Sequence, residues 1–258
     1  MKDMAVTSNI SSARKFSVVT IFPDVVRVYL GASIMRRAIA KGLIGVSVHD
    51  LRDYTQDKHR TVDDYPYGGG VGMVMKPEPF FRIAEQLWPD RDRRRIILLS
   101  PKGRLFTQHV AVELLQDDRE LVFFCGRYEA IDERIHDYLA DDEISIGDFV
   151  ITGGELPSLV IIDAVARLLP GVLGDSRSAE EDSFSCGLLD YPHYTRPEVI
   201  DGRSVPDVLL SGNHREIDRW RKKQALKATG TRRPDLLEAY RLSTDDKKIL
   251  REIKEEDL

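Results

Sequence analysis

The stretch ISIGDFVITGGELP, residues 144–157, contains the clearest indication of the fold. Residues 144–151 look like a strand, with β-branched and aromatic side chains, and an apolar run follows directly after Gly153 and Gly154. Glycine tolerates a positive φ and Pro157 suits the first turn of a helix, so the stretch fits a strand-to-helix turn. It fits equally well a place where bare backbone approaches a ligand, and these residues alone leave both interpretations open.

The size and composition of the chain limit its class. Its 258 residues are enough for one large domain or two modest ones with a substantial core. A formal net charge of −5 argues against a generally basic protein that coats nucleic acid, although it permits a local basic face. The two cysteines, Cys125 and Cys186, lack metal-ligand spacing and predict no disulfide framework, which favours a cytoplasmic protein. No apolar run reaches the roughly 18 uncharged residues that a membrane span needs.

Strand-like and helix-like segments alternate along the first part of the chain. Strands are predicted at residues 16–22, 43–51, 95–100, 121–125 and 144–151, and helices at residues 24–40, 77–87, 107–115, 131–139 and 156–169. This alternation predicts an α/β fold with a mostly parallel sheet flanked by helices. The strands are nearly continuous in apolar residues, which indicates that both faces of the sheet are buried.

The character of the sequence changes after Gly174. Residues 1–15 lack the apolar core of a signal peptide, and we expect a disordered extension there. Residues 16–174 are predicted to form the α/β domain, and the polar residues 175–190 a flexible interdomain linker. Residues 191–258 are predicted to form a small helical domain, with helices near residues 214–228 and 234–240 and a charged tail from Asp245.

Two segments with turn chemistry follow predicted strands, where ligands bind in open α/β sheets. The first, LLSPKGR at residues 98–104, is satisfied by a plain strand-to-helix turn. In the second, CGRYEAIDE at residues 125–133, capping of a helix that begins near Ala130 accounts for Glu129 and Asp132. Capping does not account for the Gly-Arg-Tyr that comes first, which favours a ligand loop.

A third segment, TVDDYPYGGGVGMVM at residues 61–75, is rich in glycine. A phosphate-binding P-loop requires Gly-Lys-Ser/Thr after the glycines, but Met73 follows Gly72 here. A dinucleotide fingerprint requires its glycines directly after the first strand. The segment therefore disfavours a nucleoside triphosphatase and a nucleotide-dependent oxidoreductase, and leaves open a flexible, hairpin-like lid.

Charged residues add further candidates. Glu180, Glu181 and Asp182 form an acidic run in the linker, and such runs are usually only solvated. Arg167 lies on an almost wholly apolar helix, where pairing with Asp163 would satisfy it. RWRKKQALKATGTRRP, residues 219–234, has seven Lys/Arg and no acid, which favours an RNA or phosphate surface over a solvated helix face. The six histidines lack metal-binding spacing, and no metal site is predicted.

These motifs occur together in one family, which the chain closely resembles: the bacterial tRNA (guanine-N1)-methyltransferases, or TrmD family. The matching segments run in order from about residue 20 to about residue 240, and they are FPDVV, DKHRTVDDYPYGGGVGM, LSPKGR, CGRYEAIDER, SIGDFVITGGELP, IDAVARLLPGVLG, EEDSF, GLLDYPHYTRPEV, VPDVLLSGNH and WRKKQAL. One departure is Ala130, where the family usually has glycine in GRYEGID.

The resemblance implies a SPOUT-type α/β fold with a deep trefoil knot, followed by a small helical domain that binds tRNA. It also implies a homodimer with active sites at the subunit interface. The methyl donor would be S-adenosylmethionine, and the substrate would be tRNA with G at position 37. Methylation of N1 of that guanosine, next to the anticodon, would prevent frameshifting.

The resemblance also assigns residues to the site. The cofactor would be held by three loops that contain Leu99, Ser100, Pro101, Gly126, Tyr128, Glu129, Ser145, Ile146, Gly147, Asp148, Phe149, Val150, Ile151, Gly153, Gly154 and Pro157. Asp182 would be the catalytic base, and Arg167 would support the guanine or the carboxylate. The tRNA would contact His59, Arg60, Gly72, Ser183, His193, Arg196, Arg219, Arg221, Lys222 and Lys223. The alternatives are another knotted RNA methyltransferase with a different target nucleotide, or a non-catalytic RNA-binding protein.

Overall fold

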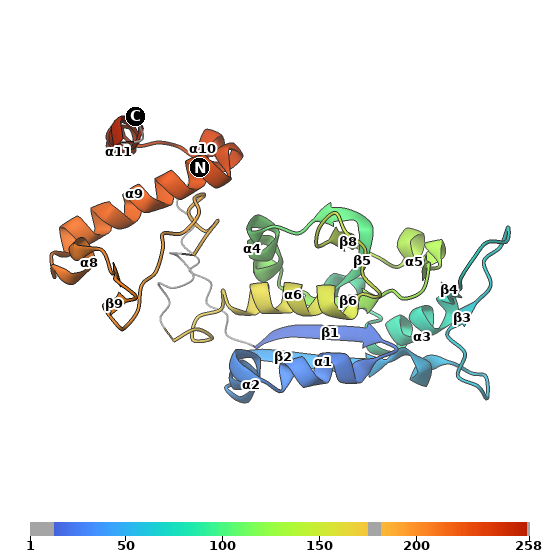
Figure 1. Cartoon of the computed structure of the whole chain (residues 1–258). Coiled ribbons are helices and arrows are strands. Elements are labelled where there is room, and N and C mark those ends of the chain that lie inside the picture. Colours follow the sequence, from blue (N-terminus) through green and yellow to red (C-terminus); the bar gives the residue numbers. More distant parts are fainter. Residues whose placement is uncertain (1–12, 175–181, 257–258) are drawn as a thin grey trace. The chain divides into compact units, whose positions relative to one another are not determined.

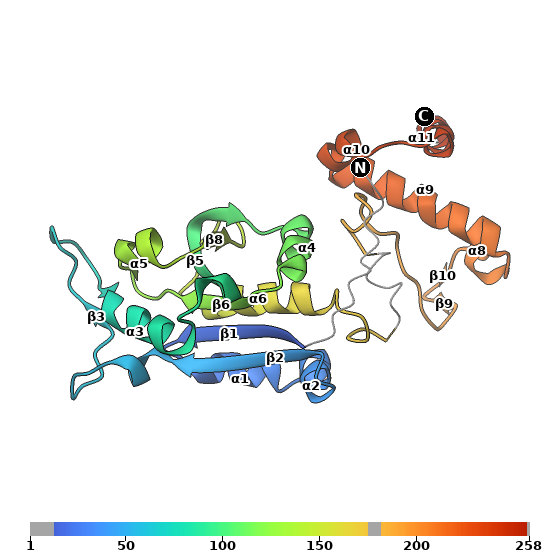
Figure 2. The ribbon, with the colours of Figure 1, turned by 180° about the vertical axis from the view of Figure 1, so that it is seen from behind.

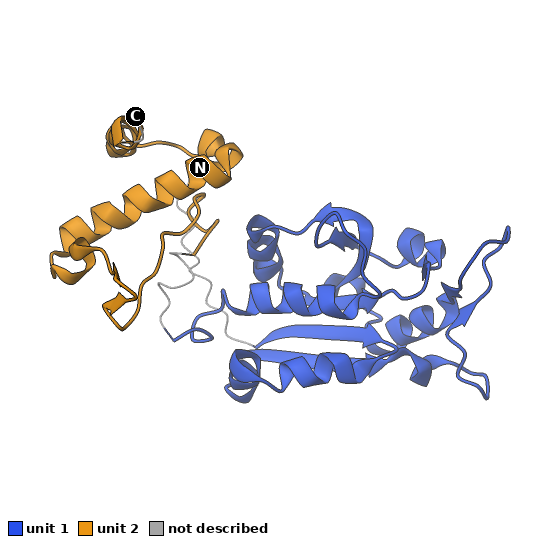
Figure 3. Ribbon diagram, viewed as in Figure 1, with its two compact units in different colours: residues 1–174 blue, residues 175–258 orange. Residues whose placement is uncertain are grey.

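The structure is a computed structural model that describes residues 13–174 and 182–256 (Figure 1). The chain divides into two compact units, residues 1–174 and 175–258 (Figure 3). Most of the predicted N-terminal extension lies outside the described residues, as does the first half of the predicted linker. Arg14 and Lys15 do not belong to that extension, because they begin strand β1 (Arg14–Thr20). The Arg14 side chain donates hydrogen bonds to the carbonyls of Leu114 and Arg119 and so fixes the start of the strand.

Unit 1 is built on a five-stranded sheet in which every pairing is parallel. The strand order is β2 (Ile44–Asp50), β1, β6 (Glu120–Cys125), β5 (Arg94–Leu105) and β8 (Asp142–Ser145). Side chains of β1 alternate between two apolar clusters, since Phe16 and Val18 join one cluster and Val19 joins the other. This confirms the predicted mostly parallel sheet that is buried on both faces.

Helices cover both faces of this sheet (Figures 1 and 2). The cluster on one face includes residues of α1 (Pro23–Leu30), α2 (Ser33–Ala40), α4 (Gln108–Gln116) and α6 (Glu155–Ala166). The cluster on the other face includes residues of α3 (Pro77–Leu87) and α5 (Glu133–Tyr138). Two short 3-10 helices, η1 (Leu51–Tyr54) and η2 (Arg91–Arg93), precede a hairpin and β5 respectively. None of the described helices is long and apolar enough to cross a membrane.

A second, small sheet lies beside the main one. Strands β3 (Asp63–Asp64) and β4 (Val74–Met75) pair antiparallel, and β4 pairs in parallel with β7 (Ala130–Ile131). The predicted start of a helix near Ala130 is therefore wrong. Asp132 instead caps α5 by accepting a hydrogen bond from the amide of Arg134.

Three further predictions about unit 1 are corrected. The strand predicted at residues 144–151 ends at Ser145, because Gly147 adopts a φ of +148° and turns the chain out of the sheet. The single helix predicted at residues 24–40 is two helices, and Gly31 caps the first of them. The turn predicted at residues 98–104 lies inside β5, which passes through a bulge so that Leu99 and Arg104 both pair with Ile144.

Unit 2 is a small helical unit with a two-stranded hairpin, β9 (Val199–Ile200) and β10 (Arg203–Ser204). Its helices are α8 (Asp207–Leu210), α9 (His214–Arg232), α10 (Pro234–Ala239) and α11 (Thr244–Glu256). The predicted charged tail is thus helix α11. It is helical because Ile249 and Ile253 pack with Leu226 of α9 in the core of this unit.

A candidate ligand site at the ends of the parallel strands

The carboxyl ends of β6 and β8 and the bulge of β5 lie at the same edge of the main sheet. Leu99 of β5 pairs with Cys125 of β6 on one side and with Ile144 of β8 on the other. The three loops that were predicted to hold a ligand leave the sheet at these residues. The structure therefore brings together segments that are far apart in sequence, as expected for the ligand-binding edge of a parallel sheet.

The second and third loops touch through their backbones. Arg127 and Gly153 form an antiparallel bridge, and the Gly154 amide donates a hydrogen bond of 3.0 Å to the Gly126 carbonyl. A Cβ atom on Gly154 would lie 2.6 Å from the Cα of Cys125, so a larger residue has no room there. Pro157 lies in the first turn of α6. The glycine pair is thus a turn into a helix, and the backbone it approaches most closely is that of the chain itself.

Residues 146–151 form an exposed loop with apolar side chains. Phe149, Val150 and Ile151 are 54%, 84% and 38% exposed. The Phe149 amide bonds to the Gly147 carbonyl, whereas the amides of Val150 and Ile151 have no hydrogen-bond partner within the described part of the chain. Exposed apolar surface beside unpaired backbone donors is the chemistry that a flat heteroaromatic ring with polar edges requires.

A buried ion pair lies behind the second and third loops. Glu155 is 1% exposed and accepts a hydrogen bond of 2.5 Å from the Thr20 hydroxyl. Its other carboxylate oxygen lies 3.0 Å from Nε and 2.9 Å from Nη2 of Arg127. The Arg127 guanidinium in turn lies over the ring of Phe22, 4.6 Å from its centroid.

In the sequence, Arg127 and Glu155 lie within candidate loops, but their side chains have no predicted role, and Thr20 lies outside those loops. Each has an ordinary explanation by itself, and the bond from Thr20 to Glu155 joins residues that are 135 positions apart. The sequence feature that could have indicated this ion pair is that Arg127 and Glu155 each directly follow a glycine at the end of a strand or turn.

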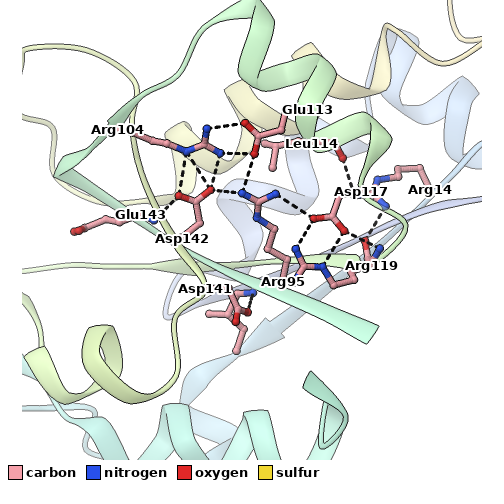
Figure 4. Close-up of polar contacts among 11 residues, drawn as sticks. Arg14, Arg95, Arg104, Glu113, Leu114, Asp117, Arg119, Asp141, Asp142 and Glu143 are labelled. Atoms are coloured by element: carbon pink, nitrogen blue, oxygen red, sulfur yellow. Dashed lines mark hydrogen bonds and ion pairs between the residues drawn. The ribbon is translucent and has the colours of Figure 1, made fainter. Parts of the chain in front are cut away.

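The first predicted loop, which starts at Leu99, forms the bulge of β5, and pairing with β8 resumes at Arg104. The side chain of Arg104 fixes this point (Figure 4). Arg104 donates hydrogen bonds of 2.7 and 2.8 Å to Glu113 of α4 and one of 2.8 Å to Asp142 of β8. Arg95 contacts the same two carboxylates (Figure 4). The hydrogen bonds from Arg104 are the main cause that lowers the pKa of Glu113 to about 2.

The glycine-rich segment forms a hairpin that projects from unit 1 (Figures 1 and 2). Its base touches the second loop, because the Glu129 amide donates a hydrogen bond of 3.1 Å to the Met73 carbonyl. A Cβ atom on Gly72 would overlap the Glu129 carboxyl group. Gly72 and Glu129, which were assigned to different ligands, are therefore neighbours. His59 and Arg60 lie before the hairpin, and Arg60 pairs with Asp53.

The two predicted catalytic residues belong to different units. Arg167 caps the C-terminal end of α6, and its amide donates a hydrogen bond to the Asp163 carbonyl. The Asp163 carboxylate accepts a hydrogen bond from the hydroxyl of Tyr29, which raises the pKa of Tyr29 to about 12. Asp182 is the first described residue of unit 2, and Glu180 and Glu181 lie outside the described residues. The catalytic roles of Arg167 and Asp182 stay predictions.

The basic stretch on α9 has acidic partners on α11. Arg219 lies 2.6 Å from Glu252, and Lys223 lies 2.5 Å from Glu256. Lys222 lies 3.3 Å from Asp246 and donates a hydrogen bond of 2.9 Å to the Tyr240 hydroxyl, whereas Arg221 lies over the ring of Tyr191. The stretch contains no acid in sequence, but acids lie beside it in the fold, so its charge is a weaker indication of RNA binding than the sequence suggests.

Three other residues predicted to contact a substrate lie in the segment before α9. His193 contacts the Asp190 carboxylate at 2.8 Å, and the hydroxyl of Ser183 accepts a hydrogen bond from the Asp190 amide. Arg196 is exposed. His193 and Ser183 thus both contact Asp190, the first through its carboxylate and the second through its amide.

Comparison with known proteins agrees with the motifs. A family described as "tRNA (Guanine-1)-methyltransferase TrmD" matches residues 14–239. Proteins of Bacillus cereus (strain AH820), Bacillus anthracis (strain CDC 684 / NRRL 3495) and Bacillus thuringiensis subsp. konkukian (strain 97-27) are each 54% identical to this chain over 242 residues. The alignments cover 93% of this chain and 99% of each relative, and all three relatives are named tRNA (guanine-N(1)-)-methyltransferase. Helix α11 lies beyond the end of the family match.

Proposed function

The chain belongs to the TrmD family of tRNA (guanine-1)-methyltransferases, and we propose that it transfers the methyl group of S-adenosylmethionine to N1 of guanosine 37 in tRNA. The modification would prevent frameshifting, and the enzyme would act in the cytoplasm, where tRNA is used. The observation that carries this proposal is the convergence of three loops on one edge of the sheet, each matching a family segment.

The residues at this edge fit S-adenosylmethionine. Val150 and Ile151 provide exposed apolar surface and unpaired amides, which suit the two faces and the polar edge of adenine. Gly126 and Gly147 are half-buried and lie in the second and third loops. The predicted contacts of Leu99 and Ser100 come from the first loop, that of Tyr128 from the second and that of Ser145 from the third. When bound, the cofactor supplies an electrophilic sulfonium methyl group.

We propose that the chain follows the knotted path of its family. The strand order supports this path. Strands β6 and β8 both follow β5 along the chain, and they lie on opposite sides of it in the sheet. Connections that thread a loop are rare in proteins, and local sequence patterns do not predict them.

A homodimer is also part of the proposal. Val25 and Val28 of α1 and Leu156 and Val160 of α6 are exposed to between 42% and 76%. The two helices are neighbours, joined by the hydrogen bond from Tyr29 to Asp163. Exposed apolar side chains on two neighbouring helices are typical of protein interfaces, and the self-complementary contact of a twofold dimer would cover them.

The proposed mechanism assigns one task to each predicted catalytic residue. Guanine N1 carries a proton and is a poor nucleophile until that proton leaves, so Asp182 acts as the base. A carboxylate is a weak base for this step, and negative charge that develops on guanine O6 must be stabilised at the same time. Arg167 stays cationic and provides that stabilisation. In the dimer, the base of one subunit would serve the cofactor loops of the other, and much of the acceleration would come from orientation.

Transfer of labelled methyl groups to two tRNA transcripts tests the proposal. The transcripts differ only in G or A at position 37, and wild type is compared with Asp182→Asn. We expect transfer to the G transcript alone, and loss of transfer in Asp182→Asn with S-adenosylmethionine binding retained. Equal labelling of both transcripts would indicate a methyltransferase with another target. Cofactor binding without transfer to either would indicate a non-catalytic RNA-binding protein.

A further inference from the structure

Glu155 connects three segments of unit 1 from a buried position between the candidate cofactor loops. We propose that Glu155 is a positioning residue, which sets the separation of the second and third loops through Arg127 and Thr20 and so holds them in the geometry that binds S-adenosylmethionine. This inference rests on the proposed function, because it concerns the cofactor of that reaction. Glu155 itself is 1% exposed and lies behind the loops, so it is not a catalytic residue.

Both carboxylate oxygens of Glu155 are used. Oε1 accepts the hydrogen bond from the Thr20 hydroxyl, whose oxygen accepts a further hydrogen bond of 2.9 Å from the Phe22 amide. Oε2 accepts the hydrogen bond from Arg127. The end of β1, the loop after β6 and the start of α6 are therefore tied to one side chain.

The charge on this side chain has a physical reason. A carboxylate in the protein interior is costly unless it is paired and hydrogen-bonded, and Glu155 meets both conditions. It is also the first residue of α6, where the helix dipole favours a negative charge. Replacing such a pair by apolar residues is often neutral for stability, so stability alone is a weak reason for an ion pair here. Orientation of Arg127 is the property that an apolar replacement would not provide.

Arg127 transmits this orientation to the loops. Its side chain lies directly across Gly153, because a Cβ atom at Gly153 would overlap the Arg127 side chain. Its backbone forms the bridge to Gly153, and the next residue, Tyr128, has a φ of +59° and an exposed ring. Gly126 and Tyr128, the two neighbours of Arg127, are both predicted cofactor contacts. A shift of about 1 Å in such contacts can cost about 100-fold in rate.

The first test uses Glu155→Gln, which keeps the shape of the side chain but removes its charge. We expect the dissociation constant and the KM for S-adenosylmethionine to rise about tenfold, because the loops lose their common anchor. The KM for tRNA should rise less than the KM for S-adenosylmethionine. Cofactor binding is measured by titration calorimetry, and the KM values come from transfer of labelled methyl groups at a temperature well below the unfolding of the variant.

Asp141→Asn is the matched control. Asp141 pairs with the buried Arg94 at 3.4 Å and accepts a hydrogen bond from the Ile96 amide. These contacts lie at the amino-terminal ends of β5 and β8, away from the candidate cofactor loops. This variant should lose stability while its affinity for S-adenosylmethionine stays unchanged. If Asp141→Asn weakens cofactor binding as much as Glu155→Gln does, the effect is one of stability and the inference is overturned.

A second variant keeps the test decisive if Glu155→Gln does not fold. Thr20→Val removes one hydrogen bond to Glu155 but leaves the ion pair with Arg127 intact, and we expect a smaller rise in the same KM. Unchanged cofactor affinity in Thr20→Val, or in a folded Glu155→Gln, overturns the inference. The proposed function fails in a different way, since wild type itself would then bind no S-adenosylmethionine or methylate no tRNA.

Discussion

The glycine-containing loops of unit 1 and the basic stretch of α9 in unit 2 are both predicted to bind a ligand. In the structure the loops converge at one edge of a sheet, whereas the basic side chains are paired with acids. The loops leave neighbouring parallel strands, so their convergence follows from the sheet. The cations of α9 instead meet carboxylates of α11, such as Glu252, which lies 33 residues from Arg219. The difference teaches that the meeting of loops at one sheet edge follows from the order of strands and helices, whereas the net charge of a surface depends on distant segments.

The two predictions differ because distant residues can neutralise a charge but cannot relieve a steric clash with the backbone. Nothing elsewhere in the chain can make room for a side chain at Gly154, since the obstacle is the backbone of Cys125. A cation, in contrast, is neutralised by any acid that the fold brings within a few ångströms. A glycine at the end of a strand is therefore a firmer indication of the local backbone path than a run of lysine and arginine is of a charged surface.

The largest expected effect would come from Gly154→Ala. The added Cβ atom would lie 2.6 Å from the Cα of Cys125, so either the second loop or the start of α6 must move. We expect a loss of about 1–3 kcal/mol in unfolding free energy and loss of measurable S-adenosylmethionine binding. Thermal unfolding and titration calorimetry measure the two effects.

Gly45→Ala is the control for this prediction, because a Cβ atom at Gly45 of β2 meets nothing within 4 Å. It should leave cofactor binding unchanged. If Gly154→Ala binds the cofactor as well as Gly45→Ala does, the comparison between backbone and charge loses its basis.

A smaller effect is expected when the acids of α11 are neutralised. In the double variant Glu252→Gln/Glu256→Gln, Arg219 and Lys223 lose their partners and become available to phosphates. Exposed ion pairs contribute little individually, so we expect tRNA to bind about threefold to tenfold more tightly at low salt. The affinity should also depend more steeply on salt concentration.

Asp245→Asn/Glu255→Gln removes the same charge from α11 and is the matched control. Asp245 pairs with Lys248 of its own helix, and Glu255 is exposed. Equal tightening in both double variants, measured by filter binding over a range of salt concentrations, would show that only net charge matters and that α11 does not mask α9.

The smallest expected effect is on stability, when an ion pair of Figure 4 is removed. These ion pairs lie in unit 1, and several of them, like those of α9, join residues that are distant in sequence. Arg104 lowers the pKa of Glu113 from 4.5 to about 2 in the folded protein. The stabilisation is therefore complete above pH 4.5 and is lost as the pH falls toward 2. Glu113→Gln should be less stable than wild type at pH 7, and this difference should shrink between pH 4.5 and pH 2. Denaturant unfolding at several pH values measures it.

Glu85→Gln, on the exposed surface of α3, is the control for the acid series. A stability difference between Glu113→Gln and wild type that stays constant from pH 7 to pH 2 would contradict the assigned role of the Arg104 ion pair.

Much of the main sheet could be predicted from sequence, and the errors have specific causes. Val150 and Ile151 look like strand residues, but their side chains are exposed in a loop, so a pattern of β-branched residues did not indicate burial there. The Ser-Pro-Lys-Gly of β5 looks like a turn, yet a bulge accommodates its proline within the strand. Ala130 was placed in a helix because its pairing partner, Val74 of β4, lies far away in sequence.

For the candidate site, the structure bears only on the convergence of its three loops, and the ligand contacts stay predictions. Its three loops carry local signals and match one family, so their residues could be named in advance. The side chains behind the loops could not, because Thr20, Arg127 and Glu155 acquire their meaning only from a contact that the fold creates. Which residues of unit 2 meet tRNA depends in the same way on the charges around them.

The small sheet has a consequence for the order of events in a catalytic cycle. The glycine-rich hairpin and the Gly126–Glu129 loop share strand pairing through β4 and β7 and a hydrogen bond from Glu129 to Met73. A movement of one is therefore passed directly to the other. If the loop holds the methyl donor and the hairpin meets the tRNA, the two substrates do not bind independently. We expect steady-state inhibition patterns of sequential addition, in which occupancy by one substrate changes the apparent affinity for the other.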